Sequence, residues 1–188
     1  GVPRWAVVSL GLPRATPVSF VDRLYRGLRR CAAAYGVDLV GGDTSRAPVI
    51  VIDVAILGEV EKGRVVYRSG ARPGDGLWVT GRLGGSYRSG RHATFTPRLA
   101  EAQALVQRVR VRAMIDLSDG LASDLWQLSR ASRVVLRVEA ARIPVARAAG
   151  SMYHALTDGE DFELLFAVGP AAAARVPRRL GRIPVTAI

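Results

Sequence analysis

The chain has 188 residues, 49% of them hydrophobic, and its 27 basic against 16 acidic side chains give a formal net charge of +11. This composition suffices for a buried core in one domain or two small ones, and the absence of a signal sequence and of any apolar run of roughly 18 residues predicts a cytoplasmic protein with no membrane partner. The charge is typical of nucleic-acid binding, but the arginines are dispersed, Lys62 is the only lysine and no zinc or RNA motif accompanies them, so we expect no nucleic-acid partner.

The first third of the chain is predicted to form strands around one helix. Apolar residues at helical spacing predict a helix over Ser19–Tyr35, with Ser19 and Asp22 forming a start like a capping box. Cys31, the only cysteine, falls on the apolar face of this helix, so we expect a buried thiol. Strands are predicted at Val7–Leu12, Val37–Val40, Pro48–Val60 and Arg64–Arg68.

The rest of the chain alternates between strand and helix patterns. The turn sequence Arg72–Asp75 marks a boundary, and we expect one domain over residues 1–68 and a second over residues 69–188. Helices are predicted at Pro97–Val109, from Gly120 onward and at Ala171–Val176. Strands are predicted at Leu77–Thr80, Ala113–Ile115, Val134–Val138, Glu163–Val168 and Ile183–Ile188. This alternation predicts an α/β or α+β fold.

The most informative motif is Asp116-Leu117-Ser118-Asp119-Gly120, which sets two carboxylates three residues apart at a predicted strand-to-helix junction. Free backbone N–H groups at a helix start attract anions, and carboxylates suit Mg²⁺ that is also held by substrate phosphates. Ser and Asp are equally the preferred N-cap residues of ordinary helices. The motif alone therefore does not distinguish a magnesium site from a helix cap.

Three other segments carry polar chemistry. Gly41-Gly42-Asp43-Thr44 follows the predicted strand Val37–Val40, so Asp43 emerges at a strand end behind glycines that let the backbone approach a ligand. Gly159–Phe166 places Glu160 and two further acids around the start of another strand. Taken singly, a glycine turn and a polar strand edge explain these segments equally well. Gly84-Gly85-Ser86 is a candidate anion-binding nest of backbone N–H groups.

In this order, Gly41–Thr44, Arg68–Asp75, Asp116–Leu121 and Gly159–Phe166 resemble the thiamine-monophosphate kinases, a family within the ATP-binding superfamily typified by aminoimidazole ribonucleotide synthetase. The resemblance runs from Gly1 to Ile188. It implies a two-domain synthetase-like architecture of mixed sheets backed by helices. It also implies ATP-dependent phosphorylation of thiamine monophosphate to thiamine diphosphate, by direct in-line transfer that needs no nucleophilic residue of the protein.

The resemblance also implies roles for individual residues. It makes ATP and Mg²⁺ the expected ligands, and a homodimer the expected assembly of the complete protein. The implied magnesium ligands are Asp43, Asp116 and Asp119. The implied nucleotide contacts are Tyr25, Gly42, Asp43, Arg68 and Ser118, and Glu160 falls where the family contacts the thiamine-bearing substrate.

The chain departs from the family pattern in several places, among them a shortened segment from Tyr87 to His92. It lacks the aspartate-rich segment that precedes the matching region and the C-terminal segment that follows it, Gly85 stands in place of a usual aspartate, and Asp158 in place of a usual glycine. We therefore expect a first domain that is incomplete and a chain that is inactive on its own. Two alternatives stay open: another enzyme of the superfamily, such as a purine-biosynthetic synthetase or a selenophosphate-forming enzyme, or a non-catalytic remnant that binds nucleotide or dimerises. Glu160-Asp161-Phe162 favours the thiamine branch.

Overall fold

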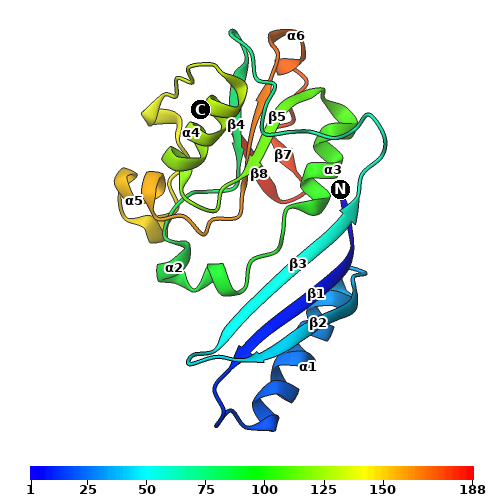
Figure 1. Ribbon diagram of the computed structural model, residues 1–188. Helices are drawn as coiled ribbons and strands as arrows, with labels where there is room; N and C mark the ends of the chain where they lie inside the picture. Colours follow the sequence, from blue (N-terminus) through cyan, green and yellow to red (C-terminus); the bar gives the residue numbers. More distant parts are fainter. The chain divides into compact units, whose positions relative to one another are not determined.

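The structure is a computed structural model that describes residues 1–188. The chain divides into two compact units, Gly1–Val65 and Val66–Ile188, called the first and second unit below (Figure 1). Each unit contains one β-sheet with helices packed against it, which confirms the α/β class expected from the sequence. None of the helices combines the length and the hydrophobicity needed to cross a membrane.

The first unit is a three-stranded sheet with one long helix. Its elements are β1 (Val2–Leu12), α1 (Val18–Ala34), β2 (Asp38–Arg46) and β3 (Val51–Glu59), and the strand order is β2-β1-β3. β1 pairs parallel with β2 and antiparallel with β3. Parallel strands require a crossover connection, and α1 supplies it and packs against β2.

The first unit has a small core for its length. Its only fully buried hydrophobic residues are Ala6, Val8 and Leu10, at alternate positions of β1. Every residue of β3 is exposed, including Ile56 at 63% and Leu57 at 54% of their full area. Because β3 is also an edge strand, it leaves apolar side chains and its outer row of backbone hydrogen-bonding groups uncovered.

Several predictions for this part of the chain were wrong. α1 begins at Val18 after Pro17, without a side-chain cap, so Ser19 forms no capping box. Cys31 is exposed, because α1 covers the sheet with half-buried residues only and its cysteine lies outside that contact. Arg64–Arg68 is not a strand. β2 runs on to Arg46, since its backbone keeps pairing with β1 beyond the apolar run.

The second unit is a five-stranded antiparallel sheet between layers of helices (Figure 1). The strand order is β5-β6-β4-β8-β7, with β6 and β4 in the interior. The strands are β4 (Gly76–Thr80), β5 (Val111–Asp116), β6 (Leu164–Val168), β7 (Arg179–Leu180) and β8 (Ile183–Ala187). The helices are α2 (Ser86–Ser89), α3 (Leu99–Arg108), α4 (Leu121–Ser132), α5 (Met152–Thr157) and α6 (Pro170–Ala173), with 3₁₀ turns η1 (Arg91–Ala93), η2 (Ala140–Arg142) and η3 (Arg147–Ala149).

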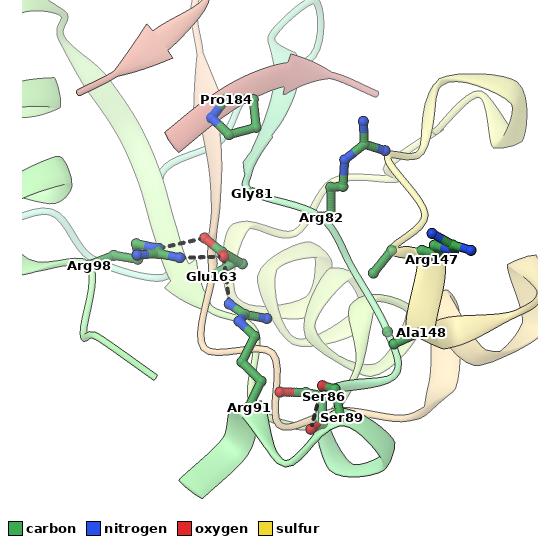
Figure 2. A pocket seen from close by; sticks show the side chains of 12 residues that line it. Gly81, Arg82, Ser86, Ser89, Arg91, Arg98, Arg147, Ala148, Glu163 and Pro184 are labelled. Carbon is green, nitrogen blue, oxygen red and sulfur yellow. Dashed lines mark hydrogen bonds and ion pairs between the residues drawn. The ribbon is translucent and has the colours of Figure 1, made fainter. Parts of the chain in front are cut away.

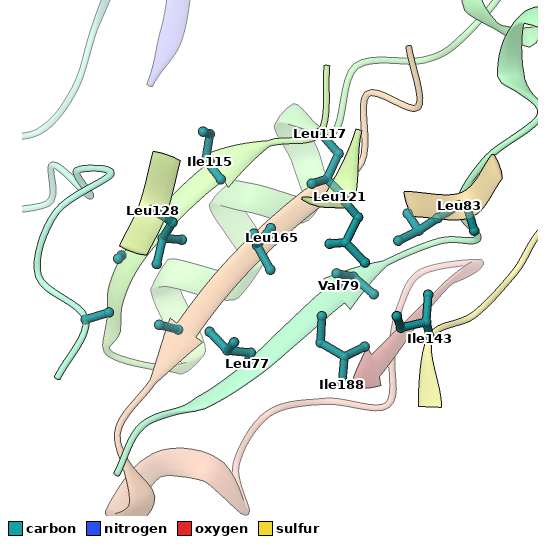
Figure 3. Packing of buried hydrophobic residues seen from close by; sticks show 14 residues of the cluster. Leu77, Val79, Leu83, Ile115, Leu117, Leu121, Leu128, Ile143, Leu165 and Ile188 are labelled. Carbon is teal, nitrogen blue, oxygen red and sulfur yellow. The ribbon is translucent and has the colours of Figure 1, made fainter. Parts of the chain in front are cut away.

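The burial of strand β6 requires that helices cover both faces of this sheet. All five of its residues are buried, and successive side chains of a strand point to opposite faces. Leu165 belongs to a core cluster with Leu121 and Leu128 of α4 (Figure 3). Phe166 belongs to a second cluster with Leu105 of α3. The helices therefore pack on opposite faces of one central strand.

Two predictions for the second unit differ from the structure. Val134–Val138 is not a strand; its alternating pattern arises because Val134, Leu136 and Val138 pack against the core while Val135 is 96% exposed. The predicted helix at Ala171–Val176 is the short α6. α2 and α5, with four and six residues, are too short to show a helical period in the sequence.

Candidate functional site

The Asp116–Gly120 loop joins β5 to α4, as the sequence predicted. β5 ends at Asp116 and α4 begins at Leu121, with Gly120 as the N-cap residue and no side chain capping the helix. Neither Ser118 nor Asp119 therefore serves as the N-cap. The side chains of Asp116 and Asp119 are exposed and form no ion pair. Both carboxylates are free to bind a ligand.

Backbone hydrogen bonds hold this loop against the Gly159–Glu163 segment. The N–H of Glu160 donates to the carbonyl of Ser118 at 2.8 Å, and the N–H of Leu117 donates to the carbonyl of Glu163 at 2.8 Å. Gly159 has a φ of +69°, and a Cβ there would lie 2.6 Å from the Ser118 carbonyl oxygen. Only glycine permits this approach. The candidate substrate residue Glu160 thus lies beside the loop that carries the two candidate metal ligands.

Negative charge is concentrated behind the loop. Asp124 of α4 is 1% exposed, and its Oδ2 accepts a hydrogen bond from the N–H of Asp119 at 3.2 Å. Burial raises the pKa of Asp124 to about 6, the Asp119 N–H opposes that rise, and the charges of Asp119 and Asp116 add to it. The three carboxylates repel one another, and no arginine pairs with them.

This corner fits Mg²⁺ as part of a larger ligand set. Mg²⁺ is usually held by one or two carboxylates together with substrate phosphates and waters. Asp116 and Asp119 offer such a pair, next to uncompensated negative charge that a divalent cation would neutralise. No group of three or more His, Cys, Asp or Glu side chains is arranged around a common point. The second unit therefore offers two candidate ligands and not a closed cage.

The first unit carries Gly42 and Asp43 inside strand β2. Asp43 is exposed, pairs with Ser9 of β1 and accepts a hydrogen bond from the Ser45 hydroxyl at 2.9 Å. The expectation that Asp43 lies beyond a strand end was wrong. A Cβ at Gly42 would lie 1.9 Å from the carbonyl oxygen of Val8. The glycine is thus explained by strand packing, and Asp43 stays a predicted ligand.

The remaining predicted nucleotide contacts are accessible. Tyr25 is half-buried on α1 and lines a cavity of about 400 Å³ with Asp22, Arg26 and Arg29. Arg68 of the second unit is exposed, and only its carbonyl is bonded, by the Ser132 hydroxyl at 3.4 Å. Its guanidinium group is free to meet a phosphate.

Sequence reasoning missed a buried ionic network at the start of β6. Glu163 is 1% exposed, and both of its oxygens accept hydrogen bonds from Arg98 at 2.7 Å. It also accepts a hydrogen bond from Arg91 at 2.6 Å (Figure 2). The Thr80 hydroxyl donates a further hydrogen bond to it at 2.7 Å. The hydrogen bond to Glu163 raises the pKa of Arg98. The acid-rich motif was the available signal, but its arginine partners lie 65 and 72 residues away.

The predicted nest at Gly84-Gly85 holds carboxylates of the protein itself. The N–H of Gly84 donates to Asp161 at 2.6 Å, and the N–H of Gly85 donates to Asp158 at 3.2 Å. Burial raises the pKa of Asp161 to about 6. The hydrogen bond with His154, followed by that from Gly85, holds the pKa of Asp158 below its ordinary value. These two N–H groups are therefore not available to an external anion.

Comparisons with known proteins agree with this architecture. Residues 1–60 match the family described as AIR synthase related protein, N-terminal domain, and residues 72–188 match its C-terminal domain. A thiamine-monophosphate kinase from Rhodopirellula baltica is 38% identical over an alignment of 196 residues, and this alignment includes 99% of the present chain. A solved structure described as AaThiL complexed with AMPPCP and TMP is 30% identical, with a TM-score of 0.85, and covers all of this chain and 67% of that one.

A second solved structure, thiamine monophosphate kinase from Aquifex aeolicus, has a TM-score of 0.81 at 30% identity, and the match covers all of this chain and 70% of that one. The curated relatives are longer. The chain spans 61% of the length of the Rhodopirellula baltica relative.

Proposed function

The chain belongs to the AIR synthase related protein family and, within it, to the thiamine-monophosphate kinases, and we propose that it contributes nucleotide-, metal- and substrate-binding residues to a kinase that converts thiamine monophosphate into thiamine diphosphate. ATP is the proposed phosphoryl donor. A related structure was described with AMPPCP and TMP, which supports both proposed ligands.

The observation that carries this proposal is the contact between Ser118 and Glu160. Their backbones are joined by a 2.8 Å hydrogen bond, so a residue proposed to meet the thiamine moiety lies beside the loop proposed to meet the nucleotide phosphates. Phosphoryl transfer needs the two reactants aligned and their charge neutralised more than it needs covalent help from the protein. Adjacent binding loops supply that alignment.

The residues of the chain have distinct tasks in this mechanism. Asp116 and Asp119, with Asp43 of the first unit, are the proposed holders of Mg²⁺, which when bound offsets the negative charge of the phosphates. Arg68 places a planar cation with several donors where it can engage phosphate oxygens, and Ser118 offers a hydroxyl. The phosphate of the acceptor is already ionised, so no side chain has to remove a proton.

Glu160 is the proposed contact to the substrate. Its side chain is exposed, and its backbone is held at a φ of +56° by the hydrogen bond to Ser118. Such a conformation is strained for a residue with a Cβ and persists where the surrounding structure imposes it. A carboxylate carried on backbone that is held in this way can pair with the cationic ring system of thiamine.

We also infer a homodimer formed through the first unit. The apolar side chains of β3 are exposed on both of its faces, among them Ile52, Ile56 and Leu57, and only three residues of this unit form its buried core. A second copy presents the same exposed strand, so two copies can cover each other in an isologous contact. Exposed apolar side chains gathered on one strand are typical of a protein–protein contact.

A chimaera tests the function. Residues 1–188 replace the matching region of the Rhodopirellula baltica kinase, and the product formed from ATP, Mg²⁺ and thiamine monophosphate is separated by chromatography. We expect thiamine diphosphate, and no product when unphosphorylated thiamine is offered as the acceptor. A folded chimaera that binds ATP yet leaves thiamine monophosphate unchanged, while the parent kinase converts it, would contradict the proposal.

A further inference from the structure

A second cavity lies in the second unit, apart from the Asp116–Gly120 loop. Its volume is about 420 Å³, and neither Asp116, Ser118, Asp119 nor Glu160 lines it. Four arginines line it against a single carboxylate (Figure 2). These side chains are Arg82, Arg91, Arg98, Arg147 and Glu163. Positive charge therefore dominates the cavity and is unused by the mechanism proposed above.

Two of the arginines are held in place by the protein. Arg98 binds Glu163 through two hydrogen bonds of 2.7 Å, and its side chain is only 12% exposed. Arg91 donates to Glu163 at 2.6 Å and to the carbonyl of Asp161 at 2.7 Å. Glu163, together with Asp161 at 3.7 Å from Arg91, offsets the charge of these two arginines. The fixed wall therefore supplies oriented N–H donors, and the excess positive charge of the cavity comes from the other two arginines.

The other two arginines have free guanidinium groups. Arg82 is exposed and makes one long hydrogen bond, at 3.3 Å to the carbonyl of Val145. Arg147, on η3, is exposed and has no hydrogen-bond or ion-pair partner within the chain (Figure 2). Both residues line the cavity, and rotation about their side-chain single bonds would turn either guanidinium group toward an anion bound there.

A buried hydroxyl without a partner also lines the cavity. Ser86 is 1% exposed, and its Oγ makes no hydrogen bond in the structure. Buried polar atoms are normally paired, because leaving one unpaired costs about 1–3 kcal/mol. A ligand oxygen at this end of the cavity would satisfy Ser86, and the same ligand would meet the donors of Arg91.

From these observations we propose that this cavity binds the phosphate group of a small phosphomonoester, at a site separate from the nucleotide and metal residues. Its charged donors are arginines, whose planar forks match phosphate oxygens, and Ser86 adds a hydroxyl. A volume of about 420 Å³ suits a small ligand and excludes a folded partner. The inference does not depend on the kinase proposal, because it uses none of that site's residues.

The test uses the 188-residue chain with inorganic phosphate as the probe, titrated by calorimetry at constant ionic strength. The double variant R82Q/R147Q removes the two free guanidinium groups and leaves the Glu163 network intact. We expect its phosphate affinity to fall at least about tenfold, since each lost charge-assisted hydrogen bond is worth roughly 1.5–3 kcal/mol. Ser86→Ala is expected to weaken phosphate binding several-fold on the same scale.

A matched control separates a site from general positive charge. R110Q/R137Q removes two exposed arginines that do not line the cavity, so it changes the net charge by the same amount. We expect phosphate affinity within about twofold of the parent chain. Equal losses in the two double variants, or no phosphate binding by the parent chain, overturn the proposal. A failed product assay with the chimaera would leave this result unaffected, so the two proposals fail separately.

Discussion

The backbone N–H of Gly85 donates a hydrogen bond to the carboxylate of Asp158, with the nitrogen 3.2 Å from Oδ2, across 73 positions of sequence. These are two of the positions at which the chain departs from the pattern of the family it resembles. The structure brings them together: a carboxylate at position 158 now lies against the backbone of position 85. A Cβ at Gly85 would lie 2.4 Å from the backbone of Ala148 and Ala149, so no larger residue fits there.

Gly85→Ala is therefore expected to be strongly destabilising. The methyl group would collide with backbone, in addition to the cost of a φ of +72° for a residue with a Cβ. We expect a loss of roughly 3–5 kcal/mol in the free energy of unfolding, measured by urea denaturation.

Gly90→Ala is the matched control. Gly90 has a φ of +73°, but nothing lies within 4 Å of the position that the alanine methyl group would take, so only the conformational cost of about 1 kcal/mol remains. Equal losses in the two variants would show that the contact with Ala148 and Ala149 is unimportant.

The second prediction concerns the buried network. Glu163→Gln removes the carboxylate that pairs with Arg98, whose side chain is only 12% exposed, and leaves Arg91 only the longer ion pair with Asp161 at 3.7 Å. Breaking a buried pair typically costs about 3–5 kcal/mol. Glu59→Gln breaks the exposed ion pair with Arg4 and is expected to cost less than about 1 kcal/mol. Thermal or urea unfolding of the two variants measures the difference. A loss at Glu163 as small as that at Glu59 would mean that the network is fully screened by water.

The third prediction is a pH dependence that comes from Asp161. Its folded-state pKa is about 6, against an ordinary value of 3.8, chiefly because of burial, with Glu163 and Asp158 adding to the rise and Gly84 and Arg91 opposing it. Between these two pKa values the folded state holds more protons than the unfolded state. The contribution of Asp161 to stability is thus complete below about pH 4 and is lost as the pH rises through about 6, by on the order of 1–3 kcal/mol.

The variant Asp161→Asn tests whether Asp161 makes the protein less stable as the pH rises. The amide oxygen can still accept the hydrogen bond from Gly84, but the side chain no longer titrates. We expect the free energy of unfolding, measured by urea denaturation at each pH, to fall less between about pH 4 and pH 7 in the variant than in the parent chain. A slope equal to that of the parent chain would assign the pH dependence to other groups.

The fourth prediction addresses the metal ligands in the chimaera. Asp116→Asn keeps the size of the side chain and removes the charge, so Mg²⁺-dependent binding of an ATP analogue is expected to weaken at least about tenfold. Asp38→Asn, an exposed aspartate at the start of β2, is expected to leave this binding unchanged. Unaltered binding in Asp116→Asn, with the fold intact by circular dichroism, would exclude Asp116 as a ligand.

The fifth prediction separates the two substrates. Glu160→Gln removes a charge-assisted contact to the thiamine moiety, worth roughly 1.5–3 kcal/mol, and leaves the nucleotide contacts in place. In the chimaera, the KM for thiamine monophosphate is expected to rise at least about tenfold while that for ATP changes little. Glu139→Gln, an exposed acid paired with Arg142, serves as the control. Equal changes in both KM values would indicate that Glu160 only supports the loop.

The sequence predicted those helices and strands whose own residues form a continuous apolar run or a helical repeat. The apolar run of β6 and the helical spacing of α4 were both identified correctly, because each buries a continuous pattern. The end of β2 was not, because its last residues are polar and are held by backbone pairing as far as Arg46, opposite Leu12. The spacing of side chains in the sequence does not indicate that backbone pairing.

In the candidate site, too, the sequence predicted features formed by neighbouring residues and did not predict contacts between distant ones. The junction at Asp116 was predicted because strand, turn and helix lie within a few residues. The pairing of Glu163 with Arg98 was not, since the two residues are 65 positions apart and only tertiary structure joins them. The same holds for Ser118 and Glu160, which backbone hydrogen bonds bring together.

The small core of the first unit has a thermodynamic consequence. With Ala6, Val8 and Leu10 as its only fully buried hydrophobic residues, this unit gains little free energy from its own folding and much from whatever covers β3. If the cover is a second copy, folding and association are one equilibrium, governed by mass action. The unfolding temperature of this unit then rises with protein concentration, whereas that of the second unit, with two core clusters of its own, does not.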